Sequence, residues 1–482
     1  MSALSATDFD VVLPELVLAL ASMGLLVAGV IWKKVQPRQM NLVAIAMLLI
    51  YGALALGGAA GGGETEAFGG VFVNDRLAVY AKVLISLGAA ATLLLADRFM
   101  ATHAAARFEY AVLAMISVLG MGVMVSARDM MALYMGIELQ SLALYVLAAF
   151  NRDSLRSSEA GLKYFVLGAL SSGIMLYGLS LIYGAAGGTS FAAIGAAIGE
   201  DAPVMAMVGL VFLMSGLAFK VSAAPFHMWT PDVYEGAPTP VTAFFAAAPK
   251  VAAMVLFART MMDPFAQSVD SWRQVMVALS VLSLGFGVFG ALAQTNIKRL
   301  MAYSSIGNMG YALMGLAAGT LAGVQAVLLY MAIYMATVIG AFACILAMRR
   351  KDGSVERIED LAGLVRTRPG LGVAFTVLML SIAGLPPLAG FWAKWWVFLA
   401  AVQAGLVWLA VAGAVAAVIG AFYYLRIVKL IWFDEPAPSF VEPARPLKAI
   451  AFVSAALAFP VLVVFIGPLF TQAGAAARSL FL

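Results

Sequence analysis

Four charged residues inside long apolar stretches are the part of this sequence best suited to chemistry. Glu138, Lys220, Lys250 and Lys394 each lie in a run of apolar residues long enough to cross a bilayer. A charged side chain at membrane depth costs about 3 kcal/mol on insertion scales, so such residues usually face the interior of a helix bundle and carry ions or protons. Burial favours a neutral lysine, whereas a nearby carboxylate favours the charged form. We therefore expect these residues to take up and release protons.

Some of these charged residues, and three polar residues near the first proline break, also have a purely structural interpretation. Glu138 can be a structural partner in a buried hydrogen-bond network, and Lys220 can extend its ammonium to the membrane interface. His227 has an unperturbed pKa near neutral and is a candidate proton relay, but it can equally cap a broken helix end. Asp232 and Glu235 fit solvated loop positions as well as they fit proton collection.

Composition places the chain in the membrane. Hydrophobic residues make up 63% and charged residues 11% of the chain, whereas roughly a quarter of the residues of soluble domains are charged. About fourteen apolar stretches are long enough to span a bilayer, the first near 11–31, read as a retained helix, and the last near 449–471. The predicted fold class is an all-α polytopic membrane protein with about 14 transmembrane helices.

The few cysteines and histidines limit the cofactors that this chain can hold. Cys344 is the only cysteine, so the chain alone cannot form a disulfide, an iron–sulfur cluster or a thiolate zinc site. His103 and His227 are the only histidines, which argues against a histidine-ligated metal or haem. We expect no cofactor and no metal in this chain.

Basic residues in the connections predict the orientation. Of the 29 lysines and arginines, 20 fall in alternate connections expected on the cytoplasmic side, and six are assigned to the other side: Arg76, Lys82, Arg128, Arg259, Arg273 and Arg478. This asymmetry follows the positive-inside rule and predicts that both termini face the periplasm. Such juxtamembrane charges are topology signals far more often than nucleic-acid contacts, so no nucleic-acid partner is expected. The Ala- and Gly-rich composition favours a bacterial inner membrane.

Two helices are expected to be broken, and their spacing suggests a repeat. Helix 7 runs into Pro225, and helix 12 is interrupted by GLPPLAG at residues 384–390. Because the two breaks are five helices apart, helices 4–8 and 9–13 are a candidate inverted repeat. The expected organisation is 1–108 for helices 1–3, 109–262 for the first repeat, 263–433 for the second, and 434–482 for a segment with helix 14.

Two motifs resemble a known family. Residues 225–241 read PFHMWTPDVYEGAPTPV, and residues 298–306 read KRLMAYSSI. Together they resemble the antiporter-like membrane subunits of respiratory complex I, and among these subunit N, over nearly the whole chain. The DVYEGAP stretch differs from the pattern typical of subunits L and M, and Lys394 matches a position where subunit M has a glutamate.

The resemblance implies roles for the buried charges. By similarity, Glu138 pairs with Lys220, Lys250 is the central lysine, and Lys394 is the terminal one on the proton path. Protons would then enter from the cytoplasmic side, while FMN, iron–sulfur clusters and quinone would belong to partner subunits. The implied partners are other membrane subunits of complex I, both antiporter-like and small, together with membrane lipids.

Three functions remain open from the sequence. The first is a subunit of a redox-driven proton pump, NADH:quinone oxidoreductase. The second is a subunit of a multi-subunit cation/proton antiporter, which shares the pattern of helices 7 and 12. The third is a membrane scaffold whose charges serve only packing. The DVYEGAP stretch favours the first over the second, and four buried charges argue against the third.

Overall fold

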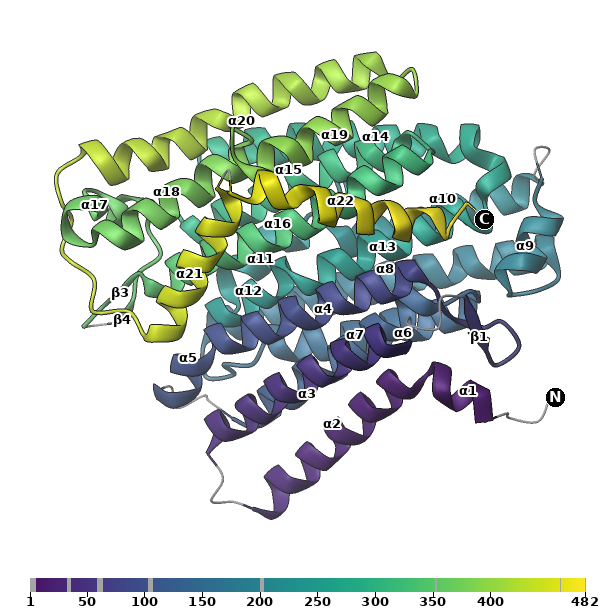
Figure 1. Cartoon of the computed structure of the whole chain (residues 1–482), viewed down its shortest axis with the longest axis horizontal. Coiled ribbons are helices and arrows are strands. Elements are labelled where there is room, and N and C mark those ends of the chain that lie inside the picture. Colours follow the sequence, from purple (N-terminus) through teal and green to yellow (C-terminus); the bar gives the residue numbers. More distant parts are fainter. Residues whose placement is uncertain are drawn as a thin grey trace.

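Apolar helices lying side by side form almost the whole of this protein (Figure 1). The computed structural model describes residues 6–32, 36–58, 64–102, 107–199, 203–351, 353–459 and 461–481. A helix satisfies its own backbone hydrogen bonds, so it is the natural form for apolar segments in lipid. Side-chain caps fix where several helices begin: Asp75, Asp129 and Asn296 each accept hydrogen bonds from backbone N–H groups of the following turn.

The N-terminal part packs three long helices beside a small hairpin. The hairpin strands are antiparallel, with Thr65 opposite Asn74. The elements are α1 (Ala6–Val11), α2 (Leu13–Ile31), α3 (Pro37–Gly58), β1 (Thr65–Ala67), β2 (Phe72–Asn74), α4 (Arg76–Leu95) and α5 (Asp97–Thr102).

The next part contains the first broken helix. It consists of α6 (Glu109–Ser126), α7 (Met130–Ala148), α8 (Leu155–Ala186), α9 (Phe191–Ala197), α10 (Val204–Val221), α11 (Trp229–Gly236), α12 (Thr239–Ala246) and α13 (Ala248–Met262). The expected break of helix 7 is confirmed between α10 and α11. Helix 8 is also interrupted, at Ala247 between α12 and α13, which the sequence analysis did not expect.

The following part contains the second broken helix. It consists of η2 (Ala266–Ser268), α14 (Val269–Leu292), α15 (Ile297–Ala317), α16 (Leu321–Ala347), β3 (Arg349–Arg350), β4 (Gly353–Ser354), η3 (Ile358–Leu361), α17 (Leu364–Thr367), α18 (Pro369–Ala383), α19 (Ala389–Gln403) and α20 (Val407–Phe433). The expected break of helix 12 is confirmed between α18 and α19.

The C-terminal segment does not form the single helix expected over residues 449–471. It contains α21 (Arg445–Ala458) and α22 (Val461–Arg478), and both neighbours of the interruption are described, with α21 ending before Phe459. Proline removes a backbone donor and clashes with the preceding turn, so Pro460 gives a sequence reason for the interruption.

Eleven helices in the described ranges are long and apolar enough to cross a membrane. The expected number of fourteen is reached only when α15 and the pairs α18/α19 and α21/α22 are added, so that number stays a prediction. The innermost elements are α12, α13, α15 and α16, which are almost wholly buried by their neighbours. The core of the bundle therefore surrounds the segment that carries Lys250.

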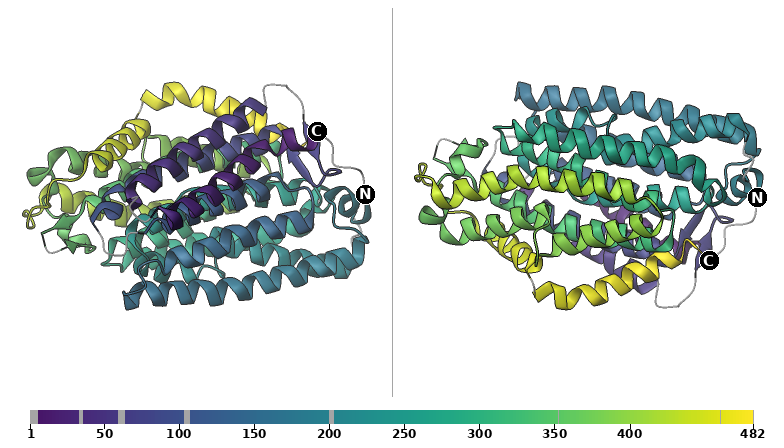
Figure 2. Two further views of the ribbon diagram at one scale, coloured as in Figure 1. Left: turned by 90° about the horizontal axis from the view of Figure 1, so that it is seen from below. Right: turned by 90° about the horizontal axis from the view of Figure 1, so that it is seen from above.

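The connections gather at two opposite ends of the bundle. One end holds α1, β1 and α9, and the other holds α5, α17 and the β3–β4 hairpin (Figure 1). Both ends of the chain lie at the α1 end, and two further views show the helix axes aligned along the same direction (Figure 2). The chain is a multi-pass membrane protein.

Candidate functional site

Lys250 of α13 hydrogen-bonds to the C-terminal end of α10, the helix that ends at the first break. The last residue of α10 is Val221, and Ser222 then takes a left-handed conformation with φ of 64°, which ends the helix. The Lys250 Nζ donates a hydrogen bond to the Val221 carbonyl oxygen at 2.9 Å and another to the Ser222 hydroxyl. Because an unpaired carbonyl is costly away from water, this ammonium both satisfies the helix end and opposes its negative dipole.

Lys394 plays the same part at the second break. Its Nζ donates to the carbonyl oxygens of Ile382 at 3.1 Å and Ala383 at 2.8 Å, the last residues of α18. Gly384 then turns left-handed, with φ of +87°, and a Cβ at this position would lie 2.8 Å from the Lys394 Cδ. Glycine therefore suits this position for two reasons. It permits the left-handed turn, and its lack of a Cβ leaves space for the Lys394 side chain.

Lys220 is buried, and it and Glu138 bind different serines. Lys220 is 9% exposed and its ammonium donates to the Ser141 hydroxyl at 2.8 Å, which argues against the interfacial interpretation. The half-buried Glu138 accepts a hydrogen bond from the Ser172 hydroxyl of α8. The two ionisable groups do not form the direct ion pair that the resemblance implies. The serines that bind Lys220 and Glu138 show that both charged side chains lie where α7, α8 and α10 pack together.

Glycines bring these helices close enough for such contacts. A Cβ on Gly178 of α8 would lie 2.6 Å from the backbone oxygen of Gly209 on α10. A Cβ on Gly136 of α7 would lie 2.7 Å from the backbone nitrogen of Met124 on α6. Small residues at helix contacts permit this close approach of backbones in membranes. The positions of Glu138 and Lys220 are thus set by backbone-to-backbone packing.

His227 lies apart from the lysines. Its half-buried ring is 5.1 Å from the ring of Phe286, whose side chain is 51% exposed. Among the described residues, its Nδ1 has no hydrogen-bond partner, and its ring makes no hydrogen bond to the buried charges. The histidine therefore sits in the α10–α11 connection toward the outside of the chain. His103 falls outside the described residues.

A polar network next to Lys394 was only partly foreseen. Asn308 of α15 accepts from the Tyr330 hydroxyl at 2.6 Å and donates to the Ser304 carbonyl oxygen at 2.7 Å. The Ser304 hydroxyl lies 2.5 Å from the Tyr424 hydroxyl, so it does not simply bond back to its own helix. A cavity of about 20 Å³ separates Lys394 from Asn308 and Tyr330. Such a volume has room for about one water molecule.

Three more hydroxyls lie buried between the two halves. They belong to Tyr234 of α11, Ser305 of α15 and Tyr334 of α16. Ser305 lies within hydrogen-bonding reach of both tyrosines, and none of the three hydroxyls has a partner in ideal geometry within the described part of the chain. Buried polar groups are normally hydrogen-bonded, so each of these three hydroxyls is able to make a further hydrogen bond. Ser305 lies in the KRLMAYSSI motif, but no sequence pattern indicates that it meets two tyrosines so far apart in the chain.

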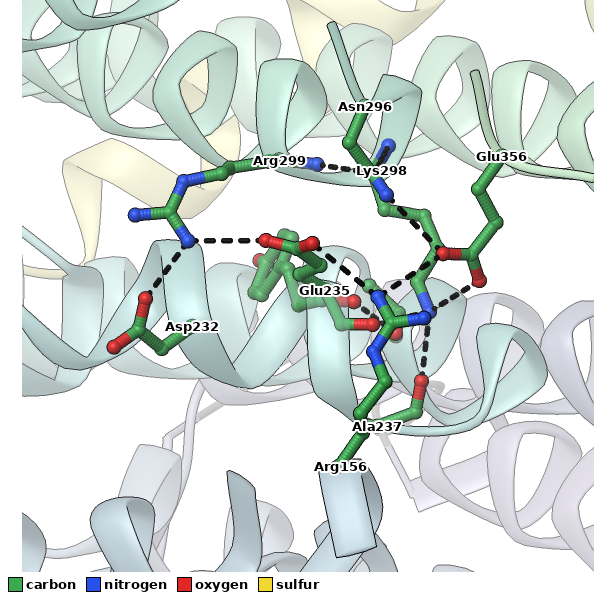
Figure 3. A network of polar contacts seen from close by, with 10 residues as sticks. Arg156, Asp232, Glu235, Ala237, Asn296, Lys298, Arg299 and Glu356 are labelled. Atoms are coloured by element: carbon green, nitrogen blue, oxygen red, sulfur yellow. Dashed lines mark hydrogen bonds and ion pairs between the residues drawn. The ribbon is translucent and has the colours of Figure 1, made fainter. Parts of the chain in front are cut away.

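Charged residues clamp α11 (Figure 3), at the end of the bundle that also carries Arg98 of α5 and Arg349 of β3. Glu235 accepts from Arg299 at 3.0 Å and from Arg156 at 3.2 Å, and Asp232 accepts from Arg299 at 2.8 Å. Lys298 is 2% exposed and donates to the backbone oxygen of Glu235 at 2.8 Å. The clamp joins α8 and α15 to the short helix that follows the first break. Asp232 and Glu235 are thus paired, and not merely solvated.

Glu356 completes the clamp from the loop after β4. It accepts from the Lys298 Nζ at 3.1 Å and from the Asn296 amide at 3.2 Å (Figure 3). Burial works to raise the pKa of Glu356, but the Lys298 ammonium and the hydrogen bonds outweigh it and hold the pKa below its ordinary value. Two hollows of about 210 Å³ each open beside the clamp, both lined in part by Arg156 and Glu235. Water therefore reaches this end of the bundle near α11.

Two residues that the sequence assigned to the loops of the opposite side are in fact buried in helices. Lys82 of α4 is fully buried, and its Nζ lies 2.8 Å from the Glu15 Oε1 of α2. Arg259 of α13 is 1% exposed, and its guanidinium lies 2.7 Å from Asp75. The assignment was wrong because a charge near a helix end looks like a topology signal until its partner carboxylate is known.

Comparisons with known proteins agree with this architecture. The family model for the transmembrane region of NADH:quinone oxidoreductase and Mrp antiporters matches residues 127–420. NADH-quinone oxidoreductase subunit N 1 of Rhizobium meliloti is 52% identical over 471 residues, covering 97% of each chain. Subunit N of Rhodospirillum rubrum is 53% identical over 473 residues, covering 97% of this chain and 96% of the relative.

Solved structures show the same fold. A chain of respiratory complex I from Thermus thermophilus with bound aureothin aligns with a TM-score of 0.82 at 33% identity, covering 96% of this chain and 99% of that one. A chain of the Mrp complex from Dietzia sp. aligns with a TM-score of 0.86 over 97% of each chain, and its 23% identity supports the fold alone. This chain therefore belongs to the family of NADH-quinone oxidoreductase subunit N.

Proposed function

We propose that this chain is a proton-translocating membrane subunit of an NADH:quinone oxidoreductase, with Glu138, Lys220, Lys250 and Lys394 carrying the proton transfer. The observation that supports this most is the placement of a buried ammonium on the open carbonyls of each broken helix, by Lys250 at α10 and by Lys394 at α18. A broken helix in a membrane can be satisfied by neutral groups such as serine hydroxyls or water, so a buried ammonium at each break is a costly choice that points to a function. Titratable groups at two breaks suit a path that must be opened and closed.

The described polar groups suggest the order of the path. Protons would arrive at the clamp end beside Glu235, reach Lys250, and pass the hydroxyls of Tyr234, Ser305 and Tyr334 toward Lys394. Support comes from the burial of those three hydroxyls close together and from the cavity of about 20 Å³ beside Lys394. A hydroxyl can donate and accept at once, so a chain of hydroxyls and water can pass a proton along. His227 is the weaker candidate, because it makes no hydrogen bond to the described charges.

The energy for pumping would come from partner subunits. Moving one charge against 100 mV costs about 2.3 kcal/mol. With one cysteine, this chain cannot hold an iron–sulfur cluster by itself. FMN, iron–sulfur clusters and quinone chemistry would then belong to other subunits. The chain would thus contribute to a redox enzyme without a redox centre of its own, next to antiporter-like and small membrane subunits.

We place the protein in a bacterial inner membrane with both termini in the periplasm. Both chain ends lie at one end of the bundle, while α5, α17 and the arginines of β3 lie at the other (Figure 1). Positive charge on the cytoplasmic side supports that orientation. The organisation into residues 1–108, an inverted pair of repeats at 109–262 and 263–433, and a segment 434–482 is proposed with it, because each repeat contains a helix whose broken end is capped by a buried lysine.

Lys250→Ala tests the proposal. Membranes carrying the variant complex are assayed for NADH-driven quinone reduction and for proton pumping, with assembly followed on a native gel. We expect an assembled complex whose pumping and coupled turnover collapse. The matched control is Lys429→Ala, which removes a 65% exposed lysine of α20 and should leave both unchanged. An assembled Lys250→Ala complex that pumps like the parent would remove Lys250 from the path and favour a scaffold.

A subunit of a multi-subunit cation/proton antiporter is the second candidate. It is favoured by the fold shared with the Mrp complex chain. The two functions separate on purification: the favoured one requires that the chain copurify with a flavin-containing assembly that oxidises NADH. Sodium-driven proton exchange in membranes without NADH oxidation would favour the antiporter instead.

A further inference from the structure

A long apolar groove opens on the face of the bundle formed by α4, α16 and α21. Its volume is about 520 Å³, and its lining is almost entirely apolar, including Leu87, Ala91, Ala336, Val453 and Leu457. Leu87 is 50% exposed, Val453 58% and Leu457 44%, so this face is open in the single chain. An open apolar groove at membrane depth calls for an apolar occupant.

The mouth of the groove is basic. The helix α21 begins at the exposed Arg445, and Lys448 follows one turn later, directly before two residues that line the groove. Lys448 and Arg368 both pair with Glu442, and Arg98 donates to the Glu442 carbonyl oxygen at 3.2 Å. Two cations thus pair with the Glu442 carboxylate, a third binds its backbone oxygen, and the exposed Arg445 lies nearby at the start of α21. Their end of the bundle is the one with α5 and α17 (Figure 1).

We infer that this groove binds an anionic phospholipid, with one acyl chain along α4, α16 and α21 and the phosphate headgroup at Arg445 and Lys448. Basic clusters at the ends of transmembrane helices recognise anionic headgroups. The volume of the groove also lies within the range of about 300–1,000 Å³ that is usual for one small ligand, which suits a single acyl chain.

The bound acyl chain has a place in the working of the subunit. Ile333 and Thr337 of α16 line both the groove and the small cavity beside Lys394, and Ala389, which begins α19, lines the groove. The wall between lipid and the cavity is therefore one layer of side chains. A chain seated in the groove covers the outer side of that wall. It keeps the polar cavity closed toward the membrane.

The test measures lipid retained by the assembled complex. Purified complexes are titrated with phosphatidylglycerol or with phosphatidylcholine, and bound lipid is counted by native mass spectrometry of the released subunit. Ala336→Phe fills the groove, and the control Val418→Phe adds the same bulk to a 75% exposed position of α20. We expect the parent and the control to retain one phosphatidylglycerol, and Ala336→Phe to bind it at least tenfold more weakly.

A second variant keeps the inference testable if Ala336→Phe fails to assemble. Arg445→Gln with Lys448→Gln removes two charges at the mouth and leaves the groove intact. At about 1 kcal/mol for each basic residue, the loss for phosphatidylglycerol should be about thirtyfold, with binding of phosphatidylcholine unchanged. Equal binding of the two lipids by the parent, or unchanged binding by the double variant, would overturn the inference. So would a photo-crosslinker at the exposed Ala449 that captures a neighbouring subunit in place of lipid.

Discussion

Lys82→Met should leave the buried carboxylate of Glu15 without its charged partner and destabilise the packing of the N-terminal helices. Lys82 and Glu15 are 0% and 7% exposed, their charged atoms are 2.8 Å apart, and the Tyr51 hydroxyl donates to the same Glu15 oxygen at 3.1 Å. Removing one partner of a buried ion pair costs about 3–5 kcal/mol, because the other charge stays buried without compensation. The double variant Lys82→Met with Glu15→Gln removes both charges and should recover most of that loss.

The measurement is the temperature at which half of the subunit leaves the assembled complex, followed on native gels after heating. The single variant should lower this temperature strongly, and the double variant should return it close to that of the parent. Lys429→Met, at a 65% exposed lysine that pairs with Asp434, is the control and should change little. If the single variant is as stable as the parent, or if the double variant is no better than the single, the pair is not energetically coupled and our reasoning fails.

Two other predictions concern Gly384 and Glu356. Gly384→Ala should abolish coupled pumping in an assembled complex, because the new Cβ would displace Lys394. Gly405→Ala, also at a positive φ but in open space, should show only the mild cost of backbone strain; equal losses in the two variants would contradict this. The stabilising effect of Glu356 is present above its ordinary pKa of about 4.3 and is lost as the pH falls through its lower folded value. The thermal stability of the parent should therefore fall on acidification more than that of Glu356→Gln, whereas parallel pH profiles would refute the assignment.

The sequence predicted the structure correctly where a charged residue and helix-breaking residues occur together in one apolar helix. Proline and glycine near Lys220 and Lys394 announced the two broken helices, and both breaks are found where expected. The partners of the lysines could not be read in the same way. Lys394 bonds to carbonyl oxygens, and every residue has one, so no side-chain pattern records this contact.

Long-range pairing was the main source of error. Arg259 reaches Asp75, which lies 184 residues away in the sequence, and without that contact it looked like an ordinary loop charge. Lys298 was likewise counted among the connections, yet it is buried and holds the junction of α11 and α12. Periodicity and hydropathy describe one helix at a time, so pairs between helices stay invisible until the packing is known.

Lys250 and Lys394 each cap a helix end, but they belong to different kinds of element. The two halves should therefore respond differently when a helix moves. Lys250 belongs to α13 and holds the end of α10, so a shift of either helix pulls on the other. Lys394 belongs to α19 and holds the end of α18, the preceding segment of the same interrupted helix. The first contact therefore links two neighbouring helices, and the second links two segments of one helix. A displacement between helices would strain the Lys250 contact directly, whereas the Lys394 contact would be strained by bending of its own helix.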